Sequence, residues 1–391
     1  MADRAMSVEG VRRRNLGEVL RLVHEEGAQS RARITASTGL NRSTVADLVA
    51  ALAEAGLVEE REPDQTKRVG RPSPIVASSD DVVAIAVNPE VDALEVGAIA
   101  LSGAVRARVR EEADRLLTPE ETAAAVARIV EGWRGRELAG KRIVGLGAAV
   151  PGLVRAADGV VRLAPHLRWR EAAVGELLHE ATGLRVAVGN DASLGARAEH
   201  LFGAAEGHEN AVYLNGGASG IGGGLILDGR PIGGAGGYAG EWGQNRPGIP
   251  DDADRRAPDG ALEDEVSRAR LLHALGLVSA DDPTLAAALA ASTSAAVADE
   301  VERQRRILAT ALANAVNVLN PSVIVLGGFL GMLVAADADG FDAAVRAHAL
   351  SAPAEGLVIR PAALAEDRLL IGAAEAAFAP LLADPLADPP A

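Results

Sequence analysis

The sequence predicts an α/β protein in two parts: a small helix-turn-helix domain with a wing over residues 1–80, and a larger α/β body over residues 81–391. Two short helical patterns around a glycine turn predict the first part, and alternating strand and helix signals from residue 81 predict the second. Because single hydrophobic cores stop growing at about 250–300 residues, we expect a body of this length to form two lobes.

The second helix of the front domain is predicted after Gly39. Asn41 is a favourable N-cap and Gly56 a C-terminal stop, and apolar residues recur between them at helical spacing. This stripe consists of Val45, Leu48, Val49 and Leu52. A second stripe predicts a longer first helix that covers the pair, and it consists of Leu16, Val19, Leu20 and Val23.

Polar residues on and around the two short helices are candidates for DNA contact, because such side chains at the start of a helix read base edges in the major groove. The candidates are Arg31, Arg33, Asn41, Arg42, Ser43 and Thr44. A basic loop between the short predicted strands 56–61 and 72–76 is a candidate wing for the minor groove, or else a solvated linker. Its basic residues are Lys67, Arg68 and Arg71.

Acidic residues are concentrated in the body. Residues 1–76 hold 12 Lys and Arg against 11 Asp and Glu, whereas residues 77–391 hold 27 against 43. A DNA-binding surface therefore has to be local to the front domain. The chain has no Cys, which excludes disulfides and thiolate metal sites. It shows neither a signal peptide nor a membrane span, and we expect a soluble cytoplasmic protein without a membrane partner.

Two apolar strands of the body end in polar residues. Residues 143–150 predict a buried strand that ends at Pro151-Gly152, and residues 185–188 predict one that ends at Gly189-Asn190-Asp191 before a helix to Phe202. Polar residues at the carboxyl ends of strands are the usual way in which an α/β sheet builds a ligand crevice. Earlier elements are predicted at 82–87, 94–100 and 104–109 (strands) and at 119–133 (helix).

Several further motifs, taken together, resemble the ROK family (repressor, open reading frame, kinase). They are Val150-Pro-Gly152, Asn190-Asp-Ala192, the glycine-rich segments 216–224 and 233–243, Gly260-Ala-Leu-Glu263 and Asn317–Gly328. The resemblance runs from the helix-turn-helix to about Ala377. It implies a bilobal actin-like, ribonuclease H-like sugar-kinase fold for the body.

The resemblance also implies a sugar site. In ROK kinases the Asp of the Asn-Asp pair is the general base, and that residue falls on Asp191. The positions that grip other sugar hydroxyls fall on Asn190, Glu241 and Glu263, and Gln244 stands where the family has a His. Taken singly, Asp191 has the alternative of capping the following helix, and the two Glu residues have that of solvated loop residues.

The phosphate-binding loop of the kinases is not matched. ROK kinases carry Asp-x-Gly-Gly-Thr after the first strand, but here the stretch Ala86–Val91 has no Gly, a Pro without an N–H donor, and the carboxylate of Glu90. We therefore expect ATP binding and kinase activity to be lost. The run Gly220–Gly224 is either a second nucleotide-type loop or a tight hairpin.

The zinc motif of the family is also unmatched, because Gln244 replaces its His and residues 245–259 have no Cys. We therefore expect no metal and no cofactor, and the following loop must be held by something else.

These observations favour a sugar-responsive DNA-binding regulator, most often a repressor, with a pseudokinase body. Its expected partners are operator DNA, a sugar or sugar-derivative effector, and further copies of the chain in a homodimer or homotetramer. An active ATP-dependent sugar kinase with an added DNA-binding domain is one alternative. A constitutive DNA-binding protein whose body only dimerises is another.

Overall fold

The computed structural model describes residues 8–62, 73–217, 220–249 and 251–387. The chain divides into two compact units, the first formed by residues 1–150, 158–189 and 373–391, and the second by residues 151–157 and 190–372. The sequence analysis placed a domain boundary at residue 80. The two compact units divide the chain at other points and do not test this boundary, which stays a prediction. Among the described residues, no helix is both long and apolar enough to cross a membrane.

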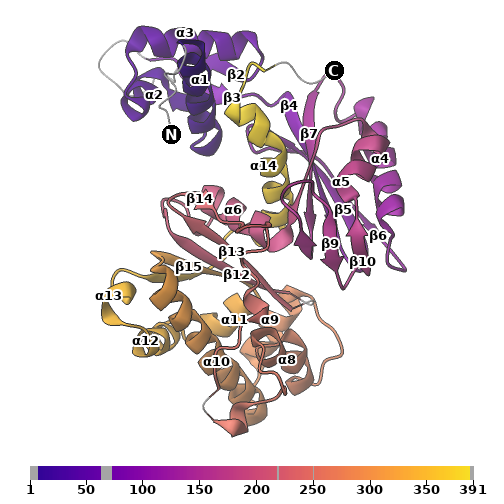
Figure 1. Ribbon diagram of the computed structural model, residues 1–391, viewed down its shortest axis with the longest axis vertical. Helices are drawn as coiled ribbons and strands as arrows, with labels where there is room; N and C mark the ends of the chain where they lie inside the picture. Colours follow the sequence, from indigo (N-terminus) through magenta and orange to yellow (C-terminus); the bar gives the residue numbers. More distant parts are fainter. Residues whose placement is uncertain (1–7, 63–72, 218–219, 250, 388–391) are drawn as a thin grey trace. The chain divides into compact units, whose positions relative to one another are not determined.

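The front of the first unit contains the predicted helix-turn-helix (Figure 1). Its helices are α1 (Val8–Glu25), α2 (Arg31–Thr38) and α3 (Arg42–Glu54). Asn41 caps α3 as expected, because its side chain accepts a hydrogen bond from the Thr44 amide. The two predicted apolar stripes are buried and form the core of this portion.

The predicted strands behind the helices are also present. β2 (Val58–Arg61) pairs antiparallel with β3 (Ile75–Ser78). A strand that the sequence analysis did not anticipate, β1 (Gln29–Ser30), pairs with the other edge of β3. The wing candidates Lys67, Arg68 and Arg71 lie outside the described residues, so their predicted role is untested.

The two large sheets share one topology. The first unit has the strand order β11-β7-β4-β5-β6, and the second has β14-β13-β12-β15-β16. In each, the first three strands in sequence form an antiparallel meander, and the fourth pairs parallel with the first. This repetition is the ribonuclease H-like duplication that the resemblance implied.

The main-sheet strands and helix α4 of the first unit lie close to where the sequence predicted them, whereas the hairpin β9–β10 and helices α5 and α14 were not anticipated. Its main sheet consists of β4 (Val82–Pro89), β5 (Ala93–Ala100), β6 (Val105–Glu112), β7 (Arg142–Val150) and β11 (Val186–Asn190). A hairpin, β9 (Val161–Ala164) and β10 (Trp169–Ala172), precedes α5. Helices α4 (Pro119–Arg134) and α5 (Val174–Thr182) cover one face of the sheet, and the C-terminal helix α14 (Arg368–Ala383) covers the other (Figure 1).

Both faces of the sheet in the second unit are buried, because alternate residues of its strands pack into two different cores. Its strands are β12 (Ala211–Gly217), β13 (Gly220–Leu227), β14 (Arg230–Pro231), β15 (Val323–Gly328) and β16 (Val358–Pro361). Tyr213 and Val325 pack towards Ala196 of α6 (Asp191–Phe202), whereas Leu214 and Leu326 join the opposite core.

Helices of the second unit build that opposite core, and a short strand, β8 (Leu153–Val154), precedes them in sequence. The helices are α7 (Leu262–Glu265), α8 (Arg268–Ala274), α9 (Asp282–Ala291), α10 (Ala295–Leu319), α11 (Phe329–Ala335), α12 (Ala338–His348) and α13 (Ser351–Ala354). Short 3-10 turns lie at Trp242–Gln244, Asp252–Asp254 and Ala365–Asp367.

Candidate functional site

The five sugar-site candidates all belong to the second unit. Asn190, not Asp191, caps helix α6: its Oδ1 accepts from the Ser193 amide at 2.9 Å. Its Nδ2 donates to the Gly152 carbonyl at 3.0 Å and to Asp191 Oδ1 at 3.2 Å. Both N–H donors of this amide are thus used within the protein, and Asn190 holds Asp191 in place. Capping of α6 therefore leaves Asp191 for another role.

The glycine run Gly220–Gly224 lies in strand β13, which pairs antiparallel with β12 from Gly220 onward. A Cβ on Gly224 would lie 2.5 Å from Cβ of Ala196, and one on Gly222 would lie 2.8 Å from Cβ of Ala192. On the other face, a Cβ on Gly223 would lie 2.2 Å from Cδ1 of Trp242. The glycines therefore let α6 and the Trp242 segment approach the strand closely, which fixes the positions of Asp191 and Glu241.

Glu263 and Gln244 form a pair. Gln244 Nε2 donates to Glu263 Oε1 at 2.6 Å, and the Ile221 amide donates to Glu263 Oε2 at 3.3 Å. Gly220 and Gly243 flank this carboxylate so closely that a Cβ on either would lie 2.4 Å from Oε2. The amide of Gln244 thus orients Glu263 in a cavity of backbone and glycine.

Electrostatics link the carboxylates of this cluster. Burial raises the pKa of Asp191 from 3.8 to about 6, against the lowering effects of the Ala192 amide and the Arg368 charge. Burial, followed by the charges of Asp191 and Glu263, raises the pKa of Glu241. Carboxylates within electrostatic reach of one another form a set of strong hydrogen-bond acceptors, which suits the hydroxyl groups of a polyol.

The loop behind Gln244 is held by buried polar side chains. Glu265 is fully buried and accepts hydrogen bonds from the amides of Arg256 and Ala257 at 2.9–3.0 Å. It also pairs with Arg303 at 3.1 Å, and Arg303 donates to the Asp254 carbonyl at 2.8 Å. These contacts hold the loop at the place where the resemblance would put zinc. The residues present do not fit that metal, because Gln244 replaces His and no Cys exists.

The turn after the first body strand is filled by ion pairs. Asn88 is buried and donates to Glu90 at 2.8 Å. Arg110 pairs with Glu90, with Asp92 at 3.4 Å and with Glu112 at 3.1 Å. These partners raise the pKa of Arg110, Glu90 being the largest cause. One guanidinium therefore faces three carboxylates, and the turn does not fit a nucleotide phosphate.

The helix-turn-helix candidates differ in how far they are engaged. Arg31 makes a bidentate pair with Glu60 of β2, and Arg33 pairs with Glu26 at 3.3 Å. Ser43 donates to the capping oxygen of Asn41 at 2.7 Å. Arg42 at the start of α3 is exposed and makes no ion pair within the described part of the chain. Of the arginines on these two helices, Arg42 is the one without an ion pair among the described residues.

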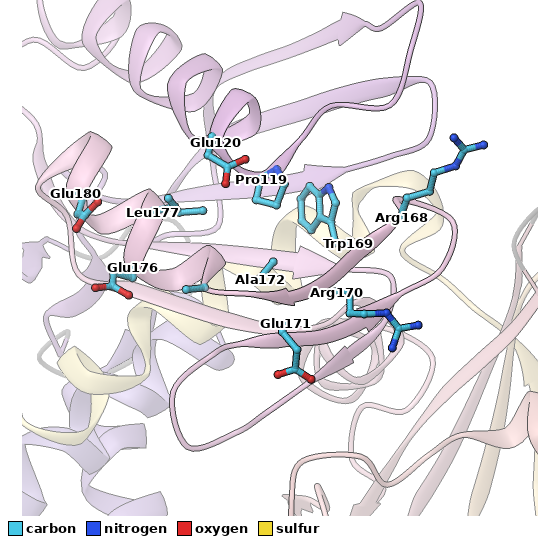
Figure 2. A pocket seen from close by; sticks show the side chains of 11 residues that line it. Pro119, Glu120, Arg168, Trp169, Arg170, Glu171, Ala172, Glu176, Leu177 and Glu180 are labelled. Atoms are coloured by element: carbon cyan, nitrogen blue, oxygen red, sulfur yellow. The ribbon is translucent and has the colours of Figure 1, made fainter.

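A separate hollow of about 420 Å³ lies in the first unit, beside α4 and α5. Figure 2 shows Trp169 next to Pro119, with Glu176 and Glu180 on one side and Arg168 and Arg170 on the other. None of the candidate residues from the sequence lines it.

A helix-turn-helix joined to a duplicated sugar-kinase-like body defines the class of protein, a sugar-responsive transcriptional regulator. A model of the ROK family matches residues 85–379, and a model of the IclR helix-turn-helix domain matches residues 15–62. The chain belongs to the ROK family.

Known relatives include both regulators and kinases. The xylose repressor of Caldicellulosiruptor bescii is 25% identical over 334 residues, which cover 79% of this chain and 81% of that protein. The glucokinase of Halalkalibacterium halodurans is 30% identical over 252 residues, which cover 59% and 74%.

Solved structures share the fold. A ROK family transcriptional regulator, a homolog of the E. coli MLC protein, has a TM-score of 0.75 at 23% identity and covers 95% of this chain and 98% of that one. The ROK hexokinase of Thermus thermophilus has a TM-score of 0.59 at 28% identity, with 76% and 99% covered.

Proposed function

We propose that this protein is a transcriptional repressor that binds an uncharged sugar at the Asp191 cluster and has no sugar kinase activity. The observation that carries the proposal is a difference between two sites. The hydroxyl-binding carboxylates Asp191, Glu241 and Glu263 are kept and held in place, whereas the phosphate-binding turn is closed by ion pairs.

The cluster favours a neutral ligand. A phosphate group on the sugar would meet carboxylates whose charges already raise the pKa of Glu241. Arg368 offsets the charge of Asp191, but Glu241 forms no ion pair within the described residues. We assign direct sugar contact to Asp191, Glu241 and Glu263, and positioning to Asn190 and Gln244, whose amides hold the adjacent carboxylates.

Phosphoryl transfer needs a backbone that cradles phosphate and a cation to neutralise it. Pro89 has no N–H to donate, and Arg110, which lies at this turn, is already paired with Glu90 and Asp92. We therefore propose that Asp191, the family's base position, serves here in sugar binding alone.

The relatives supply the first ligands to test, D-xylose and D-glucose, since they are named as xylose repressors and glucokinases. Calorimetry should detect binding of one of these to the parent protein, weaker binding of its phosphate ester, and no binding to Asp191→Asn. Glu120→Gln, in the hollow beside α4, should bind as the parent does. Loss of binding in Glu120→Gln with retention in Asp191→Asn would move the effector site to that hollow.

DNA recognition is proposed to rest on Arg42, with Asn41, Ser43 and Thr44 shaping the start of α3. A homodimer or homotetramer would present two such helices to an inverted repeat spaced by whole helical turns. Arg42→Ala should relax base preference by about 1–3 kcal/mol at one position of each half-site. Arg31→Ala should have a smaller effect, because Arg31 is already paired with Glu60. Equal effects of both substitutions would argue against this surface.

A further inference from the structure

Helix α14 belongs to both compact units. Residues 368–372 of this helix lie in the second unit, and residues 373–383 lie in the first. The other points at which the chain passes between the units, after residues 150, 157 and 189, fall outside helix interiors. Pro380, the residue of α14 at which the helix can bend, lies beyond Glu375, so Arg368 and Glu375 stand on one stiff segment of the helix.

At its N-terminal end, α14 is fixed to the helix that carries Asp191. Gly372 lies against α6 so closely that a Cβ there would be 2.3 Å from the Leu194 carbonyl oxygen. Glu199, fully buried on the same helix, accepts hydrogen bonds from the amides of Ala363 and Leu364 at 2.8–3.1 Å. These amides precede the 3-10 turn Ala365–Asp367 that leads into α14, so α6 packs against the start of α14 and the segment before it.

The first residue of α14 also reaches the effector cluster electrostatically. The charge of Arg368 acts on Asp191 and on the buried Tyr213. The Nε of Arg368 is buried without a hydrogen-bond partner in the described structure. A change in the charge or contacts of Asp191 is therefore felt at the beginning of α14.

At its C-terminal half, α14 is fixed to the helix-turn-helix. His24 of α1 is buried between Glu375 and the Leu101 carbonyl, with contacts of 2.7 Å and 2.6 Å. Gly17 of α1 meets the end of α14, where a Cβ would lie 2.7 Å from the Leu382 carbonyl oxygen. Arg13 adds an ion pair to Asp384 at 3.1 Å.

The His24 contacts are specific in their chemistry. A carbonyl oxygen only accepts, so Nδ1 must carry the proton that is donated to Leu101. Nε2 and Glu375 then share one further proton, whichever atom holds it. A buried pair of this kind costs stability when one partner is lost, so the contact resists partial opening.

We propose that α14 is the element that couples the effector cluster to the DNA-binding helices, with Gly372 and Gly17 as the two close contacts through which it acts. The proposal rests on the proposed function, since it concerns how the sugar-bound state reaches the operator-binding surface. It requires that sugar binding favour one arrangement of α6 and α14 over another.

Three Gly→Ala substitutions, all within helices, separate this role from general stability. Gly17→Ala forces α1 and α14 apart at one end, and Gly372→Ala forces α6 and α14 apart at the other. Gly132→Ala in α4 is the matched control, because a Cβ there meets nothing within 4 Å. In each helix the change itself favours helix formation by about 1 kcal/mol, so the readout is set by the contact.

The measurement is operator affinity with and without D-xylose or D-glucose, together with calorimetric sugar affinity of the DNA-free protein and its melting curve. We expect the sugar to change operator affinity about 5- to 150-fold in the parent and in Gly132→Ala. The change should fall below about 2-fold in Gly17→Ala, while the DNA-free protein still binds sugar. A full sugar response in both Gly17→Ala and Gly372→Ala would overturn the coupling role of α14.

A second arm needs no sugar. Operator affinity is measured for Asp191→Asn, Gly17→Ala and the double variant, and coupling through α14 predicts effects that do not add. Additive effects in this cycle contradict the inference. If the parent responds to no sugar, the proposed function fails by itself, and the cycle still decides whether α14 couples the two ends.

Discussion

The Asp191 cluster in the second unit and the turn after β4 in the first stand where sugar kinases bind sugar and phosphate, but their charged groups are paired differently. In the cluster, Glu263 accepts from the neutral amides of Gln244 and Ile221, and Glu241 faces other carboxylates. In the turn, Arg110 is surrounded by Glu90, Asp92 and Glu112.

The proposal of a sugar sensor without kinase activity rests on this difference. A carboxylate that receives neutral donors keeps its negative charge and spare lone pairs for a ligand, whereas one paired with arginine is already satisfied. The proposed sugar site is of the first kind, and the turn after β4 is of the second.

The largest effect is expected from loss of the buried Glu265–Arg303 pair, which holds the loop behind Gln244. Glu265→Ala leaves the Arg303 guanidinium buried and removes the acceptor for two loop amides, so it should cost about 3–5 kcal/mol of unfolding free energy. The measurement is the denaturant midpoint, with Asp252→Ala as control, since the Asp252 side chain is 100% exposed. Chelator should leave the parent midpoint unchanged. A lower midpoint in chelator would show that a metal holds this loop.

The next effect tests the comparison itself. Asp191→Asn should abolish the effect of sugar on operator affinity, about 5- to 150-fold in the parent, while the sugar-free protein still binds the operator. Glu90→Gln, in the turn, should keep the full response, because its carboxylate serves only Arg110 and Asn88. The measurement is operator binding titrated with D-xylose or D-glucose. The reverse pattern would mean that the turn holds the effector.

A smaller effect is expected from pH. The pKa of Asp191 is raised from 3.8 to about 6, so the carboxylate acceptor is lost as pH falls through about 6. As pH increases, sugar affinity should therefore rise by up to about tenfold per pH unit until about pH 6, and it should level off at higher pH. For folding the sign is opposite: this group favours the folded state below about pH 4, and that contribution disappears as pH rises through about 6.

Calorimetry between pH 5 and 8 checks this prediction. Because Glu241 interacts with Asp191, the midpoint belongs to the pair. The profile should become flat in any variant of Asp191 that still binds sugar weakly. A flat profile in the parent would exclude Asp191 as an acceptor for the ligand.

The last prediction is that the protein shows no sugar kinase activity. Adding ATP and sugar to the parent should give no sugar-dependent ADP release, since Pro89 and Glu90 stand where phosphate would bind. Turnover at about 1 per second or faster, an ordinary enzymatic rate, would restore the kinase alternative.

The sequence by itself determined the helix-turn-helix and, in the body, the strands of the first large sheet and helices α4 and α6. These features follow from local rules: the period of apolar residues, the cap at Asn41, and glycine and proline punctuation. Motif spacing was sufficient to select Asp191, Glu241 and Glu263, although not to show that Asn190 is the cap.

Contacts between residues far apart in sequence were decided only by the tertiary structure. The glycine run lies in a strand whose two faces are approached closely by α6 and by Trp242. No local sequence pattern records these contacts. The Glu265–Arg303 support and the His24–Glu375 contact join residues 38 and 351 positions apart. Burial makes these polar pairs specific, because an unpaired charge inside the protein is costly, and burial is a property of the folded chain alone.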